Sequence, residues 1–125
     1  MAQALQVSTP DAAYVINKAV LRAADYLKLS NAELAKIIGV SEASVSRAKN
    51  NGASLTNNQK VQEVALLFVR LYRSLDAFIG GEDAVSAKWL RAQNKAFGKS
   101  PAEMIVTLPG LIAVIDYLDA ARGIV

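Results

Sequence analysis

Few side chains in this 125-residue chain could carry out acid–base chemistry. Two close carboxylate pairs occur, Glu82 with Asp83 and Asp116 with Asp119, and the second pair has the spacing of one helix face. Two such acids could act as a general acid and a general base. Nothing near either pair in the sequence would separate the pKa values of its members. We expect the first pair to fit a helix N-terminus and the second pair to lie on a solvated helix face.

The chain lacks residue types on which most catalytic and metal sites depend. The chain has no histidine, the usual general base near neutral pH and the commonest metal ligand, and no cysteine for thiol chemistry. Gly80 and Gly81 lack the spacing and the following Lys-Ser/Thr of a phosphate-binding loop. The sequence predicts no catalytic residue, no metal site and no cofactor. A small enzyme is the weaker interpretation, and binding is the expected activity.

Residues 29–50 predict a helix-turn-helix that binds DNA. Two short helical patterns meet at Gly39, which can take the positive φ of a tight turn. Ala35 is small enough for the second helix to approach, and Val45 packs that helix back onto the first. In such a motif the second helix enters the DNA major groove. The alternative is an ordinary αα-hairpin.

The second helix of this motif, residues 41–50, carries mostly short polar side chains. Arg47 can reach guanine O6 and N7 or a phosphate, and Ala43 can touch a thymine methyl group. A plain surface role for Arg47 is the alternative, because phosphate and solvent contacts outnumber base contacts in such helices. The residues predicted to face DNA are Ser41, Glu42, Ala43, Ser44, Ser46, Arg47, Lys49 and Asn50.

The positive charge is concentrated in the half of the chain that holds this motif. Residues 1–60 carry seven Lys and Arg against four Asp and Glu, whereas residues 61–125 carry seven against seven. An excess of basic residues favours contact with phosphates. The charge distribution therefore agrees with DNA as a partner, although it means little without the motif.

Helical periodicity, capping residues and glycines predict an all-α fold. We expect a bundle with the helix-turn-helix, a long connecting helix and a small helical C-terminal domain. Residues 1–7 are expected to be a frayed arm, and Ser8, Thr9, Pro10 and Asp11 to begin the first helix. Capping boxes are predicted at residues 30–33, 56–59 and 100–103. The expected helices cover approximately residues 10–29, 30–39, 41–50, 57–79, 82–93, 100–107 and 108–121.

The expected long helix, residues 57–79, has two apolar faces. One face forms a continuous stripe, and Leu66, Leu67, Val69 and Ile79 widen it. The second face predicts a homodimer, with a helix buried in the middle of a bundle as the alternative. Because Gly80 and Gly81 stop the helix, we expect a DNA-binding and dimerisation region in residues 1–80 and a second domain in residues 81–125.

The chain shows no membrane or export signal. No apolar run reaches the roughly 18 residues of a membrane span. The N-terminus lacks a basic region followed by an apolar stretch. We expect a cytoplasmic protein without a membrane partner.

Residues 87–101, AKWLRAQNKAFGKSP, resemble the signature of the Xre/MbcA/ParS toxin-binding domain. The core of the signature is Trp-Leu, a following Asn, a Gly and then Ser-Pro. Residues 110–123, GLIAVIDYLDAARG, resemble the closing helix of that domain. The resemblance covers approximately residues 20–125. It assigns a framework role to Trp89, Asn94, Gly98, Ser100, Pro101 and Gly110.

The resemblance implies a type II antitoxin that pairs with a RES-domain toxin. Such toxins consume NAD⁺ or use it for ADP-ribosyl transfer. The C-terminal region is expected to cover the NAD⁺ pocket of the toxin, and the helix-turn-helix to repress the promoter of the operon. The residues expected to bind the toxin are Trp89, Asn94, Ser100, Arg122, Gly123, Ile124 and Val125.

Two of these assignments have alternatives. Trp89, the single tryptophan, is predicted first as an anchor of the small C-terminal core and second as an interface residue. Arg122 could instead form a surface pair with Asp119, three residues earlier. For the whole chain, the alternative function is a stand-alone helix-turn-helix regulator whose C-terminal domain only dimerises or senses a ligand.

Overall fold

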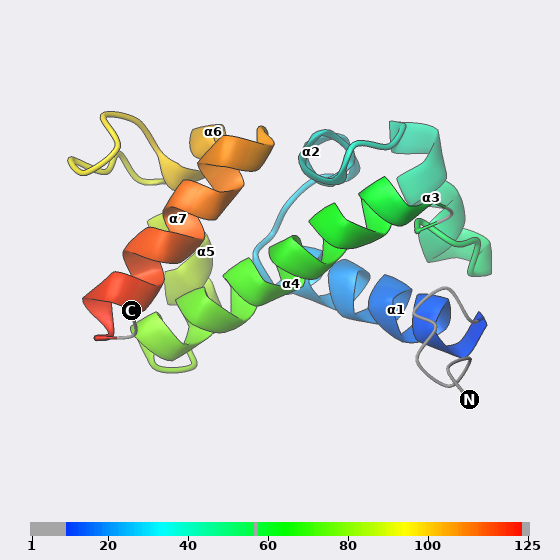
Figure 1. Cartoon of the computed structure of the whole chain (residues 1–125), viewed down its shortest axis with the longest axis horizontal. Helices are drawn as coiled ribbons and strands as arrows, with labels where there is room; N and C mark the ends of the chain where they lie inside the picture. The colour runs from blue at the N-terminus through cyan, green and yellow to red at the C-terminus, as the bar shows by residue number, and fades with distance from the viewer. Residues whose placement is uncertain (1–9, 57, 124–125) are drawn as a thin grey trace.

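The computed structural model describes residues 10–56 and 58–123 (Figure 1). Within these residues the fold is all-α, as predicted, and the only strand-like pairing is an isolated bridge between Asn94 and Lys99. None of these helices is long and apolar enough to cross a lipid bilayer. The helices are α1 (Pro10–Tyr26), α2 (Asn31–Ile38), α3 (Glu42–Asn51), α4 (Gln59–Ile79), α5 (Asp83–Arg91), α6 (Pro101–Met104) and α7 (Leu108–Ala121).

The helix-turn-helix of α2 and α3 forms where it was predicted. Ser30 and Glu33 make a reciprocal capping box at the start of α2. Gly39 ends the helix at φ 83°, and its N–H donates to the carbonyl of Ala35. Ser41 caps α3 by accepting a hydrogen bond from the N–H of Ser44. Short-range hydrogen bonds therefore set both ends of the turn.

Several helix boundaries differ from the predictions. Helix α1 ends at Tyr26, earlier than residue 29, because Lys28 takes a left-handed φ of 56° and the N–H of Leu29 returns to the carbonyl of Ala24. Helix α4 begins after Asn58, whose side chain accepts the N–H of Val61 at 2.9 Å. The predicted cap Thr56 is buried in the preceding turn.

The C-terminal helices also end earlier than expected. Helix α5 stops at Arg91 rather than near residue 93, and the loop before α6 begins at Ala92. Helix α6 stops at Met104 rather than near residue 107, since Thr107 instead caps α7 by accepting the N–H of Gly110 at 3.1 Å. A Cβ added to Gly110 would lie 1.8 Å from the carbonyl oxygen of Met104. Only glycine allows α7 to start this close to α6.

Helix α4 runs through the whole molecule and packs against both halves of the chain (Figure 1). Phe68, Leu71 and Leu75 are fully buried, and one apolar core joins residues of α1, α2 and α3 with residues of α5 and α7. Part of the second apolar face of α4 packs against this core, as the bundle alternative predicted. Leu66 does not, since its exposed fraction is 46%.

Candidate functional site

Helix α3 presents a polar surface to solvent. Only Val45 and Ala48 of this helix are buried, and they face the rest of the bundle. Six of the eight residues predicted to face DNA are exposed, and Ser44 and Ser46 are half-buried. The short side chains on this surface allow close approach by another molecule, as entry into a major groove requires. DNA contacts by these residues stay predictions.

Hydrogen bonds within α3 hold part of this surface in place. The side chains of Ser41 and Ser44 are 2.9 Å apart, oxygen to oxygen. Arg47 donates from Nη2 to the Oγ of Ser44 at 3.2 Å, and Asn50 donates from Nδ2 to the Oγ of Ser46 at 3.4 Å. A guanidinium has five N–H donors, so Arg47 keeps donors for a base edge or a phosphate.

A second candidate surface surrounds Trp89, at the opposite end of α4 from α3 (Figure 1). The ring of Trp89 stacks on Tyr117 with centroids 6.3 Å apart and meets the edge of Phe78 at 6.0 Å. Phe97 packs edge-on against Tyr117 at 5.1 Å. Trp89 is half-buried, so its ring anchors this aromatic cluster and still reaches the surface.

Asn94 and Ser100 shape the loop between α5 and α6. Asn94 pairs through its backbone with Lys99 and accepts the N–H of Ala96 on its side chain at 2.9 Å. Ser100 is buried and caps α6, with its Oγ 3.1 Å from a carboxylate oxygen of Glu103. Both residues therefore have a structural role. Contact of either residue with a toxin stays a prediction.

Asp119 contradicts the prediction of a solvated face. It is buried on α7, where it accepts hydrogen bonds from Arg70 at 2.7 Å and from Ser74 at 2.9 Å. The hydrogen bond from Arg70, helped by the one from Ser74, lowers the pKa of Asp119 below its ordinary value. Arg122 adds only a weaker through-space attraction, so the alternative of an Arg122–Asp119 pair is not what forms.

Asp116 is exposed, as predicted. Glu82 and Asp83 lie at the start of α5, as predicted for a helix N-terminus. Asp83 is half-buried there and accepts the hydroxyl of Tyr72 at 2.9 Å. Burial and this hydrogen bond to Asp83 raise the pKa of Tyr72.

The end of α7 is open to solvent. Arg122 and Gly123 are both exposed beyond the last helical turn, and Gly123 has a left-handed φ of 81°. The remaining two residues predicted to bind a partner, Ile124 and Val125, lie outside the described residues. A cation at this end of a helix is next to the negative end of its dipole.

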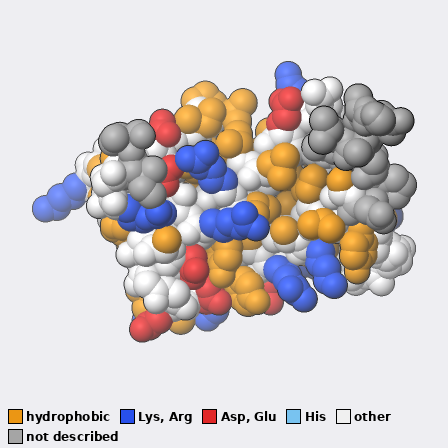
Figure 2. Space-filling model, turned by 60° about the horizontal axis from the view of Figure 1, so that its bottom comes forward, with side chains coloured by type: hydrophobic (Ala, Val, Ile, Leu, Met, Phe, Trp, Pro, Cys, Tyr) orange, Lys and Arg blue, Asp and Glu red, His pale blue; other side chains and the backbone are white. Residues whose placement is uncertain are grey.

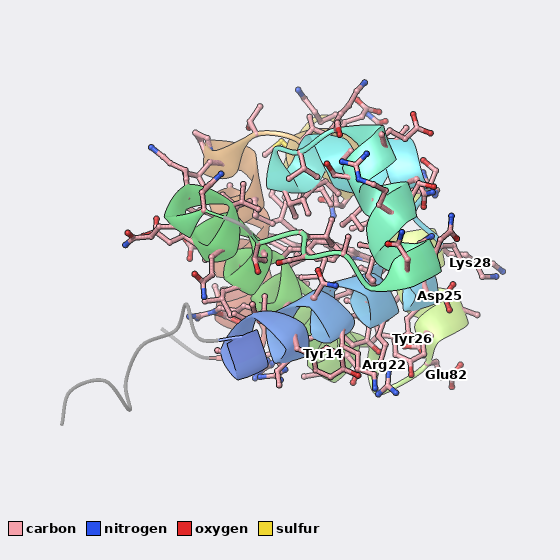
Figure 3. All side chains as sticks on the ribbon, turned by 90° about the vertical axis from the view of Figure 1, so that its right-hand side faces the viewer. Tyr14, Arg22, Asp25, Tyr26, Lys28 and Glu82 are labelled. Atoms are coloured by element: carbon pink, nitrogen blue, oxygen red, sulfur yellow. The ribbon has the colours of Figure 1, made fainter. Side chains whose placement is uncertain are left out.

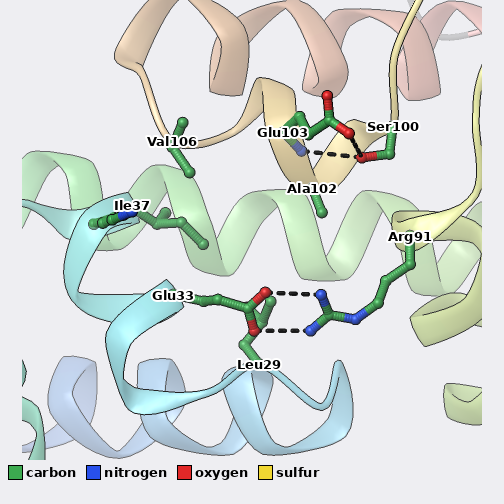
Figure 4. Close-up of a pocket in the computed structure, with 9 residues that line it drawn as sticks. Leu29, Glu33, Ile37, Arg91, Ser100, Ala102, Glu103 and Val106 are labelled. Atoms are coloured by element: carbon green, nitrogen blue, oxygen red, sulfur yellow. Dashed lines mark hydrogen bonds and ion pairs between the residues drawn. The ribbon is translucent and has the colours of Figure 1, made fainter.

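An ion pair that the sequence did not predict joins the two halves. Arg91 of α5 donates two hydrogen bonds to Glu33 of α2, at 2.7 and 2.8 Å, and a third to the carbonyl of Lys28 (Figure 4). The hydrogen bond from Arg91 lowers the pKa of Glu33 to about 2. The pair lines a cavity of about 510 Å³ between α2 and α6. The partners are 58 residues apart, so no local pattern indicated them.

Two family models match the chain. Residues 17–70 match the antitoxin Xre-like helix-turn-helix domain, and residues 74–123 match the antitoxin Xre/MbcA/ParS C-terminal toxin-binding domain. The chain belongs to the Xre/MbcA/ParS family of antitoxins. No curated protein matches it.

The matches agree with the two surfaces of this antitoxin. The first includes the whole of α2 and α3, and the second includes Trp89, the loop before α6 and the exposed end of α7. The two matches adjoin within α4, before Gly80. Both family descriptions name an antitoxin of a toxin–antitoxin system. The division into residues 1–80 and 81–125 stays a prediction.

Proposed function

We propose that this antitoxin inhibits a RES-domain toxin with its C-terminal region and represses its own operon through α3. The proposal is supported by two different exposed surfaces that lie at opposite ends of α4. One is the polar face of a helix-turn-helix, and the other belongs to a matched toxin-binding domain. The proposed setting is the bacterial cytoplasm, where both the promoter and the toxin are accessible.

For repression, α3 enters the major groove of promoter DNA, and Arg47 contacts a guanine or a phosphate. The surface of α3 offers few basic side chains, so a single copy would bind weakly. We propose a homodimer whose two copies bind two half-sites of the promoter. The partner in this activity is double-stranded DNA, with no cofactor.

The DNA proposal is tested with Arg47→Ala in a gel-shift titration of the promoter. If Arg47 reads a guanine, the loss is about 1–3 kcal/mol of binding free energy. Lys95→Ala is the matched control, since it removes one exposed cation far from α3. Wild-type affinity in Arg47→Ala would remove this side chain from the interface. Toxin inhibition should be unchanged in Arg47→Ala.

For inhibition, the end of α7 enters the NAD⁺ pocket of the toxin. Arg122 has a planar guanidinium with five N–H donors. This group and the following apolar residues Ile124 and Val125 would occupy the space that the dinucleotide needs. The surface that docks beside the end of α7 in this proposal includes Trp89 and Asn94, and the buried Ser100 caps α6 behind the loop that carries Asn94.

The inhibition proposal is tested by NAD⁺ loss in the presence of the cognate toxin. A chain lacking residues 122–125 and the variant Arg122→Ala should both inhibit less than the full chain at equal concentration, with gel-shift affinity unchanged. Lys36→Ala is the control, because it removes an exposed cation that lies outside the matched toxin-binding domain. Equal inhibition by the truncated chain would assign the block to the Trp89 surface. Failure to bind a RES-domain toxin would favour a stand-alone regulator.

A further inference from the structure

A shallow apolar groove lies between α1 and α4. It has a volume of about 320 Å³ and is lined by Val15 and Ala19 of α1, by Leu66 and Val69 of α4, and by Arg70 and Arg73. The exposed fraction is 63% for Val15 and 46% for Leu66. Large apolar side chains exposed side by side indicate a surface that another molecule covers.

The exposed face of α4 has an ordered sequence of charges along this groove. Glu63, Leu66, Arg70 and Arg73 follow one another at spacings of three and four residues, so they lie on one face of the helix. The acid is at one end, the apolar residue is in the middle, and the bases are at the other end. A second copy of the same helix, placed antiparallel, would set acid against base at both ends.

The charges at the two ends are available for such pairing. Glu63 is exposed, and the 3.5 Å from its carboxylate to the Nε2 of Gln59 is longer than an ordinary hydrogen bond. Arg73 is exposed and makes no hydrogen bond or ion pair with the described residues. Arg70, in contrast, is engaged with Asp119. Arg73 is therefore the base best able to meet an acid from outside the chain.

Apolar and basic side chains also surround the groove. Figure 2, which brings the lower face of Figure 1 forward, shows apolar side chains gathered among basic ones. Figure 3 labels Tyr14 and Arg22, two further side chains of α1 that do not line the groove, and the exposed fraction of Tyr14 is 62%. Among the described residues, none of α3 or α7 lines the groove, although Arg70 in its lining is bound to Asp119 of α7.

We propose that two copies of this antitoxin associate through the α1–α4 groove, with their α4 helices antiparallel. Leu66 of each copy lies near the two-fold axis, and Glu63 of each copy faces Arg73 of the other. A parallel arrangement would instead bring like charges together, which is unfavourable. This inference rests on the homodimer in the proposed function and adds the surface that forms it.

The first test measures the mass of the full chain in solution by light scattering across micromolar concentrations. The wild type should be a dimer, and Leu66→Glu should be a monomer with unchanged helical circular dichroism. Leu108→Glu is the matched control, because Leu108 has the same exposed fraction of 46% but lies at the start of α7. This control should remain a dimer.

The second test reverses the charges. Glu63→Arg and Arg73→Glu should each raise the dissociation constant of the dimer about tenfold, and the double variant should return it close to the wild-type value. Failure of the double variant to recover would overturn the antiparallel pairing.

The outcomes separate the interface from the proposed function. A dimer that survives Leu66→Glu would overturn the α1–α4 interface and leave the homodimer standing. A wild-type chain that is a monomer at every concentration would overturn both the interface and the homodimer. DNA binding by α3 would still be judged by the Arg47→Ala titration, which does not depend on this result.

Discussion

Helix α3 and helix α7 carry the two proposed binding surfaces, but they are held in place by different means. Helix α3 depends on its neighbours in sequence, through the cap at Ser41 and the glycines Gly39 and Gly52 at the two turns. Helix α7 depends on contacts outside itself, because Asp119 is bound to Arg70 of α4 and Gly110 lies against the carbonyl of Met104 in α6. Changes of similar size should therefore cost more stability in the C-terminal half.

The largest expected effect comes from glycine substitutions. Gly110→Ala should lower the free energy of unfolding by about 3 kcal/mol, because the new Cβ would overlap the carbonyl of Met104 in a packed region. Gly39→Ala meets open space and should cost only about 1–2 kcal/mol, the strain of a left-handed Ala. Urea unfolding monitored by circular dichroism measures both. Equal losses of unfolding free energy would mean that α6 and α7 move apart at little cost, and that the C-terminal half is not the more sensitive one.

The next effect comes from the buried carboxylate of α7. Asp119→Ala should lower the free energy of unfolding by about 2 kcal/mol, because it leaves the buried hydroxyl of Ser74 without its acceptor. Asp116→Ala is the control on the same helix, and its exposed side chain should change stability by less than about 0.5 kcal/mol. Thermal unfolding of the two variants gives the difference. Equal stability of the two variants would show that the Asp119 contacts contribute little to the stability of this half.

A smaller effect is expected at the cap of α3. Ser41→Ala should cost about 1 kcal/mol of unfolding free energy, because the N–H of Ser44 loses its side-chain acceptor. Ser46→Ala makes the same change inside the helix, where alanine is favoured, and should be neutral or stabilising. Chemical unfolding of both proteins provides the measurement. A neutral Ser41→Ala would show that packing of Val45 and Ala48, rather than the cap, positions α3.

The smallest effect should come from the ion pair that joins the halves. The pKa of Glu33 falls from 4.5 to about 2, so the ionised acid stabilises the fold above pH 4.5, and this contribution is lost as the pH falls toward 2. The side-chain exposed fractions of Arg91 and Glu33 are 44% and 37%, so solvent limits the gain to about 0.5–1 kcal/mol.

This last prediction is measured as the loss of unfolding free energy between neutral and acidic pH. Glu33→Gln should flatten that part of the pH profile, whereas Glu82→Gln, at an exposed acid without a capping hydrogen bond, should leave it unchanged. An unchanged profile in Glu33→Gln would mean that the pair does not couple the halves energetically. The acid dependence would then have to come from Asp119.

The errors of sequence-based prediction follow the same division. The ends of α2 and α3 were predicted correctly because Ser30, Gly39 and Ser41 act on backbone groups within four residues. The cap of α4 was assigned to Thr56 instead of Asn58, since adjacent polar residues compete for the same N–H groups. The prediction for Asp119 failed because its helix spacing gave no sign that Arg70 and Ser74 would lie beside it.

The sequence by itself determined the all-α class, the helix-turn-helix and the resemblance to a toxin-binding domain. These depend on residue types at short, regular spacings, where a backbone group and its partner are always within reach. Only the tertiary structure decided that Asp119 is buried, that Glu33 meets Arg91 and that Leu66 and Val15 share an exposed groove. Each of these depends on how two helices dock, which is set by the packing of the whole core rather than by any one segment.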